Sequence, residues 1–243
     1  MRVAGRIVAD TIELLVSKVQ PGMSTLDLDR IAEHHMRERG SIPSFKGYRG
    51  FPASICTSIN QEVVHGIPSA KRPLRPGDLL SLDVGAVWDG YHADSAVSLF
   101  VGSDPPSETA EALVRATRES LDAGIAALRA GARLSDVGHA VQGVVEAAGF
   151  SVVREYVGHG VGRALHEDPQ VPNYGEPRRG PLVRPGLVVA IEPMVNEGDW
   201  PTNVLADRWT VVTTDGSLSA HFEHTMAVTE NGTEVLTARS DER

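Results

Sequence analysis

The fold of this chain is decided by residues 81–98, which read SLDVGAVWDGYHADSAVS. The dipeptide Asp89-Gly90 near the centre is a strong signal for a two-residue hairpin turn, because such turns need positive φ angles that Asp and Gly tolerate. The residues on either side alternate between apolar and polar or small side chains, as they do in half-buried strands. The stretch therefore predicts two antiparallel strands joined at this dipeptide.

Two carboxylates share one face of the predicted hairpin. With the turn at this place, Gly85 faces Asp94 and Asp83 faces Ala96, so both aspartates point to the same side. Their backbones would lie roughly 7–8 Å apart as diagonal neighbours. A divalent ion with oxygen bonds of about 2.0–2.2 Å could bridge them. The hairpin alone leaves two interpretations open: a metal site, with Gly85 and Ala96 small to leave room for it, or a solvated face with two ordinary aspartates.

The composition is that of an ordinary globular protein. The chain has 243 residues, of which 41% are hydrophobic and 23% charged, with a net charge of −9. An acidic chain is a poor candidate for a nucleic-acid surface. We find no apolar run of about 18 residues and no signal segment, and the single cysteine, Cys56, permits no internal disulfide. These features predict a cytoplasmic protein of a reducing compartment, without a membrane span.

An internal repeat runs through the chain at an offset of 109 residues. Residues 74–83 (LRPGDLLSLD) recur as residues 183–192 (VRPGLVVAIE), and residues 22–28 recur in looser form as residues 131–137. Matches that share one offset are the signature of a duplicated unit.

The repeat predicts a single domain over residues 1–243, built from two α+β halves related by a pseudo-twofold axis. The halves would span about residues 1–105 and 106–243. Asp83 then corresponds to Glu192, so each half delivers a carboxylate near the end of an equivalent strand. A solvated polar face does not explain this symmetry.

Periodicity and capping residues locate the main elements. They predict helices over residues 3–19, from Ser24 to Gly40, from Ser107 to about Arg129, and over about residues 135–148. Residues 187–191 predict an apolar strand that ends at Glu192, and residues 219–225 predict one strand that places His221 and Glu223 on one face. In residues 158–162, three glycines around His159 predict a close backbone approach, but no Lys-Ser/Thr follows that would indicate a phosphate loop.

Five residues taken together indicate a metal centre. Glu223 or His159 alone would most simply be a satisfied polar residue. The set of four carboxylates and one neutral imidazole carries a charge of −4, which two divalent ions would cancel. Such an oxygen-rich set suits Mn, Fe, Co or Zn in a catalytic pair. The five residues are Asp83, Asp94, His159, Glu192 and Glu223.

These residues stand in motifs that cover essentially the whole chain. The motifs are SIN (58–60), VVHGIP (63–68), SLD (81–83), HADSA (92–96), GHGVGR (158–163), HEDP (166–169), IEPM (191–194) and FEHT (222–225). In this combination the chain resembles the type 1 methionine aminopeptidases of the short bacterial kind. The resemblance implies the α+β pita-bread fold, with antiparallel sheets and pairs of helices outside. It also implies a dimetal hydrolase that removes the initiator methionine from nascent proteins whose second residue is small.

The resemblance assigns roles to single positions. Two divalent ions (Co, Fe, Mn or Zn) would be held by Asp83 on one ion, by Asp94 and Glu223 as bridges, and by His159 and Glu192 on the other ion. Glu192 would also shuttle a proton. His166 would stabilise the scissile carbonyl, and His65 would contact the substrate near the scissile amide.

The resemblance also implies a methionine pocket and a monovalent-cation site. The pocket positions are Phe45, Tyr48, Phe51, Cys56, His65, Leu165 and Trp209, and the cation positions are Asn60 and Ser219. An apolar, aromatic slot suits an unbranched thioether. Three residues depart from common family residues: Phe45 and Leu165 in the pocket, and His221 beside it.

Two other functions stay open. A proline-specific (Xaa-Pro) aminopeptidase of the same fold would share the five ligands, although those relatives usually carry a further N-terminal domain. A non-enzymatic pita-bread binding protein would have no need of all five. The partner expected is the N-terminal methionine of a nascent peptide, with at most a transient ribosome contact, no nucleic acid and no membrane. We expect a monomer, and the sequence leaves open whether it is the main or an accessory enzyme of its host.

Overall fold

The computed structural model describes residues 1–102 and 104–242. Within these residues the α-helices are α1 (Arg2–Lys18), α2 (Thr25–Glu38), α3 (Glu108–Ala127) and α4 (Ser135–Ala147), and the short 3₁₀ helices are η1 (Tyr48–Gly50) and η2 (Ser240–Glu242). All four predicted α-helices are present, and each end lies within two residues of its predicted position. None of the described helices is long and apolar enough to cross a lipid bilayer.

One large sheet forms the centre of the molecule. Its main path runs β1-β4-β5-β14-β9-β7-β8, with β2 beside β4 and β15 beside β14. The strands are β1 (Ile42–Pro43), β2 (Ile55–Ile59), β4 (Leu79–Trp88), β5 (Tyr91–Phe100), β7 (Gly158–Gly160), β8 (Glu167–Val171), β9 (Val188–Ile191), β14 (Glu223–Thr229) and β15 (Gly232–Val235). β14 thus lies between strands of the first and second halves.

Two three-stranded sheets complete the β structure. One has the order β13-β10-β6, from β6 (Ser151–Val152), β10 (Met194–Asn196) and β13 (Ser219–His221). The other has the order β11-β12-β3, from β3 (Glu62–Val64), β11 (Thr202–Val204) and β12 (Val211–Thr213).

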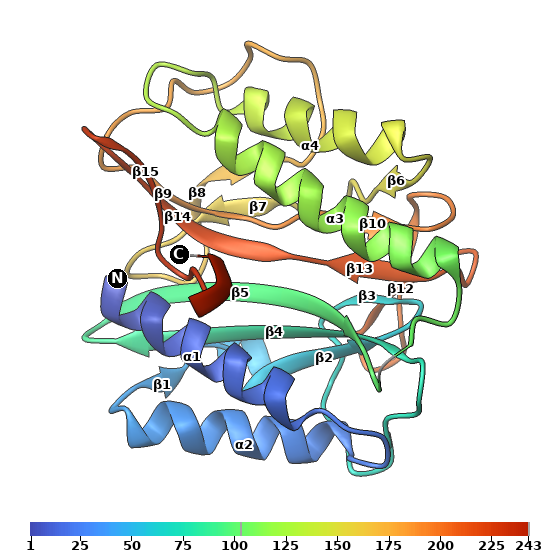
Figure 1. The fold of residues 1–243 in the computed structure, drawn as a ribbon. Helices are drawn as coiled ribbons and strands as arrows, with labels where there is room; N and C mark the ends of the chain where they lie inside the picture. Colours follow the sequence, from blue (N-terminus) through green and yellow to red (C-terminus); the bar gives the residue numbers. More distant parts are fainter. Residues whose placement is uncertain (103, 243) are drawn as a thin grey trace.

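The two helix pairs cover the same face of the large sheet. Figure 1 shows α1 and α2 over the strands of the first half, and α3 and α4 over those of the second. The main core lies between these layers and contains fully buried Ile12, Leu28, Leu82 and Ile191. Burial of side chains of this size stabilises the fold by about 1.5–3 kcal/mol each. The helix layer therefore fixes the sheet from one side and leaves its other face to carry the site.

The hairpin at residues 81–98 forms as predicted. Asp83 pairs with Ala96, and Gly85 pairs with Asp94. The turn residues Asp89 and Gly90 have φ angles of 50° and 73°, as a primed two-residue turn requires.

The internal repeat is visible in the hydrogen bonding. A β-bridge joins Ser24 to Pro73, and a second joins Arg133 to Leu182. Each residue of the second bridge lies 109 residues after its counterpart. The following helices also begin alike: Asp27 accepts from the Ser24 backbone N–H at 3.0 Å, and Asp136 accepts from the Arg133 backbone N–H at 2.9 Å. These equivalent contacts confirm that the two halves have the same local structure, as the repeat and the pita-bread fold predict.

Two predictions about local structure were wrong in detail. The single strand predicted over residues 219–225 is divided at Phe222 into β13 and β14, which belong to different sheets. The space above Gly85 is not free for a ligand, because a Cβ there would lie 2.6 Å from Cε1 of Phe45 and 2.9 Å from Cβ of Ser44. The glycine at this position allows an aromatic ring to lie directly on β4.

The glycines around His159 serve the packing of strands. A Cβ at Gly158 would lie 2.4 Å from the carbonyl oxygen of Ala190, and one at Gly160 would lie 2.3 Å from that of Asp168. The close approach predicted at these glycines is therefore an approach by the backbone of neighbouring segments of this chain.

Candidate active site

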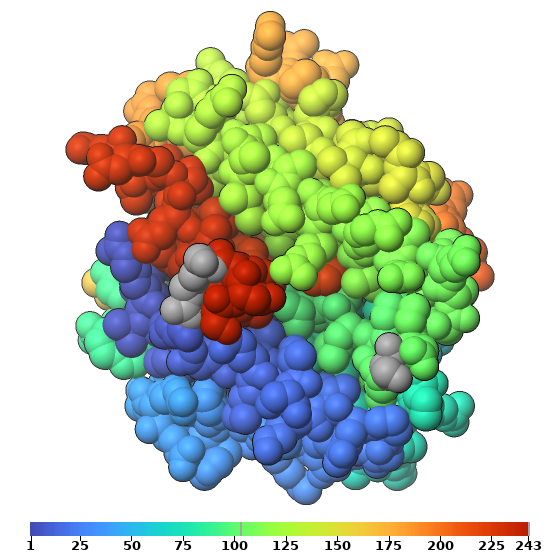
Figure 2. Space-filling view, viewed as in Figure 1, coloured from blue at the N-terminus to red at the C-terminus, as the bar shows by residue number. Residues whose placement is uncertain are grey.

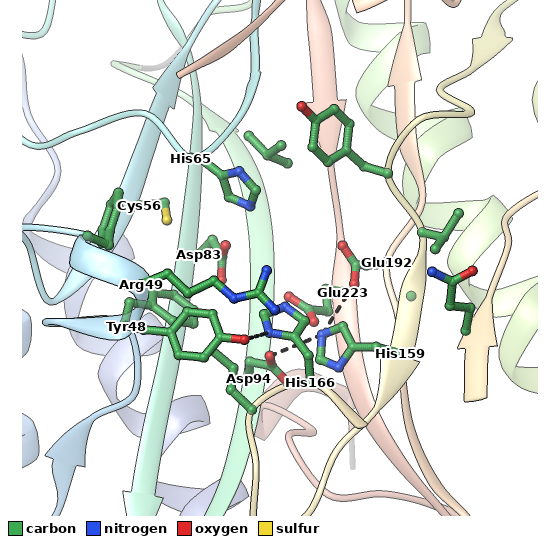
Figure 3. Close-up of a pocket in the computed structure, with 18 of the residues that line it drawn as sticks. Tyr48, Arg49, Cys56, His65, Asp83, Asp94, His159, His166, Glu192 and Glu223 are labelled. Atoms are coloured by element: carbon green, nitrogen blue, oxygen red, sulfur yellow. Dashed lines mark hydrogen bonds and ion pairs between the residues drawn. The ribbon is translucent and has the colours of Figure 1, made fainter. Parts of the chain in front are cut away.

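Every residue that the sequence predicts as a metal ligand lines one cavity of about 620 Å³. Figure 3 shows these side chains directed toward one another from both halves of the chain. The five are Asp83, Asp94, His159, Glu192 and Glu223. The fold therefore collects into one cavity residues that are up to 140 positions apart in the sequence.

Strand register places the carboxylates in a compact group. Asp83 on β4 and Glu223 on β14 both pair with Ala96 of β5. Asp94 lies two residues before Ala96 on the same strand, so its side chain points to the same face. Glu192 directly follows β9, which pairs with β14 on the side opposite to β5 along the main path of the sheet.

Three donor atoms lie close enough to share one ion. Single ligand atoms of Asp94, His159 and Glu223 lie within 4.8 Å of one another, and all three residues are buried. His159 Nε2 is 3.6 Å from Asp94 Oδ2 and 3.5 Å from Glu192 Oε1. This spacing leaves room for an ion at the centre of the group.

The tautomer of His159 suits a metal ligand. Its Nδ1 lies 2.9 Å from the backbone carbonyl oxygen of Gly160. A carbonyl oxygen only accepts, so Nδ1 donates its proton there, and Nε2 is the nitrogen that faces the carboxylates and can offer a lone pair to a cation. Metal-bound histidines usually have their second nitrogen fixed in this way.

Burial and mutual repulsion disfavour the ionised forms of these carboxylates. Burial and the repulsion of Asp94 raise the pKa of Asp83 well above its usual value. The pKa values of Glu192 and Glu223 are also raised by burial and by the neighbouring carboxylates. Asp83 Oδ1 is buried and makes no hydrogen bond. Buried ionised groups are stable only when paired or bound to cations, so the donor set fits divalent metal ions.

Two further histidines line the cavity in neutral form. Burial lowers the pKa of His65 to about 4, and burial together with the nearby His159 lowers that of His166 to about 3. His166 Nδ1 lies 2.8 Å from the hydroxyl oxygen of Tyr48. The ring centroid of His166 is 4.2 Å from that of His159. Neutral imidazoles at these places can donate or accept hydrogen bonds with a substrate.

The residues predicted for the methionine pocket gather into one apolar cluster at the cavity wall. Phe51 and Trp209 contact each other edge to face, with ring centroids 5.0 Å apart. All six apolar or aromatic pocket residues belong to the cluster and line the cavity: Phe45, Tyr48, Phe51, Cys56, Leu165 and Trp209. Ala53 and Ile67 join the cluster without having been predicted.

Sequence reasoning missed several other lining residues. Arg49 stands beside Tyr48, with its guanidinium carbon 5.4 Å from the tyrosine ring centroid. Tyr156 meets His65 edge to face at 5.8 Å. Glu155 and Gln170 also line the cavity. Glu155 and Tyr156 stand in an irregular segment and Arg49 in the single turn of η1, where no periodicity indicates the direction of a side chain.

The two positions predicted for a monovalent cation also lie together. The backbone N–H of Ser219 donates to the carbonyl oxygen of Asn60 at 2.9 Å. His221 lies nearby on β13 but is not among the cavity lining, and its Nε2 is buried without a partner. Burial lowers the pKa of His221 to about 3, so the ring is neutral.

Comparison with known proteins gives consistent matches. The family model for metallopeptidase family M24 matches residues 1–230. Methionine aminopeptidase 1 of Bacillus subtilis is 55% identical over 237 residues, covering 98% of this chain and 94% of that protein. Methionine aminopeptidase 1 of Mycobacterium tuberculosis is 53% identical over 243 residues, with coverage of 98% and 91%.

Solved structures of known proteins have the same fold. The crystal structure of a methionine aminopeptidase from Thermotoga maritima has a TM-score of 0.96 and 47% identity, covering 98% of this chain and 95% of that one. A prolidase from Pyrococcus furiosus has a TM-score of 0.75 at 21% identity and covers 98% of this chain and 63% of that one, which is a likeness of fold alone.

Proposed function

Because this chain belongs to metallopeptidase family M24, we propose that it is a methionine aminopeptidase, which removes the N-terminal methionine from proteins whose second residue is small. The observation that carries the proposal is that two features line the same cavity. One is a buried group of four carboxylates and a histidine, and the other is an apolar cluster beside it. The first can hold hydrolytic metal ions, and the second suits the methionine side chain.

We propose that the cavity holds two divalent ions. Asp83 would bind one ion, His159 and Glu192 the other, and Asp94 and Glu223 both. The donor set suits Co, Fe, Mn or Zn. Bound ions of this kind supply a Lewis acid for the carbonyl and lower the pKa of a water molecule.

Glu192 would move the proton during hydrolysis. Its carboxylate would take a proton from the attacking water and deliver it to the nitrogen of the leaving amine. Glu192 lines the cavity, and its Oε1 lies 3.5 Å from Nε2 of His159, so its carboxylate stands at the centre of the donor group, which supports the role.

His166 and His65 would orient and stabilise the substrate as neutral groups. When the Tyr48 hydroxyl donates to Nδ1 of His166, the proton of that ring lies on Nε2 and can be donated to the carbonyl oxygen as it gains negative charge. His65, between the aromatic rings of Tyr156 and Trp209, would contact the substrate near the scissile amide.

The pocket would set the specificity for the first residue. Phe45, Tyr48, Phe51, Cys56, His65, Leu165 and Trp209 would enclose the methionine side chain. Holding the free α-amine of the substrate at the metal centre would limit cleavage to the first peptide bond.

The remaining properties are part of the same proposal. Residues 1–243 would act as one catalytic domain and as a monomer in the cytoplasm, with at most transient contact to the ribosome. Asn60 and Ser219, whose backbones already meet, would help to bind a monovalent cation.

An assay of peptide cleavage tests the proposal. The metal-loaded protein should release methionine from Met-Ala-Ser and leave Met-Glu-Ser and Leu-Ala-Ser essentially uncut. Cleavage of Xaa-Pro peptides alone would favour the proline-specific alternative. Binding of Met-Ala-Ser without any turnover would favour a scaffold.

A further inference from the structure

The C-terminal segment (residues 236–242) lies on the helix side of the large sheet, directly behind the candidate metal centre. In Figures 1 and 2 it occupies the space between α1 and α3. The backbone N–H of Ser240 donates to Glu13 Oε1 on α1 at 2.5 Å, and Arg118 Nη2 on α3 is 3.5 Å from Glu242 Oε1. The segment is therefore attached to both halves of the chain.

A first set of hydrogen bonds leads from this segment to Asp94. Thr237, which is fully buried, accepts from the Thr225 backbone N–H through its hydroxyl oxygen at 3.1 Å. The Thr225 hydroxyl oxygen in turn lies 2.8 Å from the carbonyl oxygen and 3.1 Å from carboxylate Oδ1 of Asp94. Two threonines thus connect the segment to a carboxylate of the metal centre.

A second set runs through His224, the residue after Glu223. Its Nδ1 lies 2.9 Å from the Thr237 hydroxyl oxygen, and its Nε2 lies 3.4 Å from Glu242 Oε2. Because the ionised carboxylate of Glu242 can only accept, Nε2–H donates to it, and in this tautomer of the neutral ring Nδ1 accepts the proton of the Thr237 hydroxyl. The ring is held from both sides by residues of the C-terminal segment.

Arg239 connects the C-terminal segment to the backbone of Glu223 through Ser95. The Ser95 hydroxyl donates to the Glu223 carbonyl oxygen, and Arg239 Nη1 lies 3.4 Å from the same hydroxyl oxygen. Arg239 is only 8% exposed, and its Nη2 donates to Glu242 Oε1 at 2.6 Å. A buried guanidinium needs such a partner, so removing the charge of Glu242 disturbs the whole group.

We propose that the C-terminal segment positions the metal ligands Asp94 and Glu223 from behind the sheet. Thr237 and Glu242 are the positioning residues, and they act through Thr225, His224 and Ser95. This inference rests on the proposed function, because it takes Asp94 and Glu223 as ligands. Outer hydrogen-bond partners of metal ligands typically contribute about 10–100-fold to metal affinity.

A pair of substitutions at one position tests the first connection. Thr237→Val keeps the shape and loses the hydroxyl, whereas the matched control Thr237→Ser keeps the hydroxyl. We expect Thr237→Val to weaken Mn²⁺ binding to the metal-free protein about tenfold, and Thr237→Ser to stay within about twofold of the parent. Titration calorimetry measures the affinity, and thermal unfolding of the metal-free variants measures stability separately.

A second pair tests Glu242. Glu242→Gln should also weaken Mn²⁺ binding about tenfold. Glu234→Gln is the control, because Glu234 on β15 forms an exposed ion pair with Arg2 on α1 at 2.7 Å, away from the network. That control also loses a charge that links the C-terminal part of the chain to α1, and it should bind Mn²⁺ like the parent.

The outcomes separate this inference from the proposed function. Failure of the parent protein to bind Mn²⁺ would overturn the proposed function. Parent-like binding by both Thr237→Val and Glu242→Gln would overturn only the positioning role. If neither variant folds without metal, the segment is a requirement for folding, which also contradicts a positioning role. If one fails to fold, the other decides.

Discussion

Asp83 and Glu223 pair with the same residue, Ala96, from opposite sides of β5. Neighbouring strands lie about 4.8 Å apart, so their backbones are separated by roughly twice that distance. Asp94 projects from the strand between them, on the same face. The carboxylate of Asp94 is therefore the one best placed to lie near the carboxylates of both Asp83 and Glu223.

This position makes Asp94 the most sensitive member of the group. We expect Asp94→Asn to reduce Mn²⁺ affinity by at least about 100-fold, because a directly bound carboxylate should matter more than its outer partners. Asp83→Asn should instead lower the number of ions bound. Isothermal titration calorimetry distinguishes the two effects. Asp89→Asn, the same change at the turn of the hairpin, is the control and should bind like the parent.

The metal-free protein should become less stable as the pH rises. Burial raises the pKa of Asp83, Glu192 and Glu223 in the folded state. The folded state then holds protons that the unfolded chain has lost above about pH 4, so stability falls as the pH rises through the raised pKa values. We expect the thermal midpoint to decrease between about pH 5 and pH 8 and to recover when Mn²⁺ is added.

A substitution identifies the source of this effect. Asp83→Asn should stabilise the metal-free protein at pH 8 by about 1–3 kcal/mol, the typical cost of a buried group without a partner. Chemical denaturation with the metal removed measures the difference. A thermal midpoint of the parent protein that rises from pH 5 to pH 8 would contradict the burial of these carboxylates as the cause.

Tyr48 should assist catalysis through His166. Tyr48→Phe removes the hydroxyl that lies 2.8 Å from His166 Nδ1 and leaves the ring in place. We expect kcat on Met-Ala-Ser to fall about tenfold with KM nearly unchanged, which is less than the 10²–10³ expected for loss of a donor itself. Tyr91→Phe is the control, since the Tyr91 hydroxyl accepts from Arg163 outside the cavity. A rise in KM alone would assign Tyr48 to binding.

Gly85 should influence the pocket through Phe45. An added Cβ would lie 2.6 Å from the Phe45 ring and would displace it. We expect Gly85→Ala to lower kcat/KM for Met-Ala-Ser about tenfold, and to have much less effect when combined with Phe45→Ala. Steady-state kinetics of the two single variants and the double variant give the coupling. Additive losses would show that the glycine acts by another route.

Much of the centre could be predicted because it depends on local rules. The Asp89-Gly90 turn fixes the register of the hairpin, and the register puts Asp83 and Asp94 on one face. The 109-residue repeat then links Asp83 to Glu192, since equivalent strands end at equivalent places. Such deductions need only a period of two along strands and an internal comparison of the chain.

The rest depends on contacts between distant segments. No pattern in residues 219–225 shows that two sheets divide at Phe222, because the division is set by the strands on which each part packs. Arg49 reaches the cavity from the single turn of η1 and Tyr156 from an irregular segment, where side-chain direction follows from tertiary packing. The hydrogen bonds that join Thr237 to His224 and Thr225, behind the candidate metal centre, likewise appear only when β14 and the C-terminal segment are in place.

The place of β14 in the large sheet has a consequence for biosynthesis. β14 lies between β5 and β9, although it follows both in the sequence. A chain emerging from the ribosome can form the β4–β5 hairpin early, but β5 and β9 have no shared neighbour until β14 is made. Pairings between such distant segments form slowly. A partly synthesised chain lacks Glu223 and the strand that joins the halves, so hydrolytic activity should appear only after nearly the whole chain has folded.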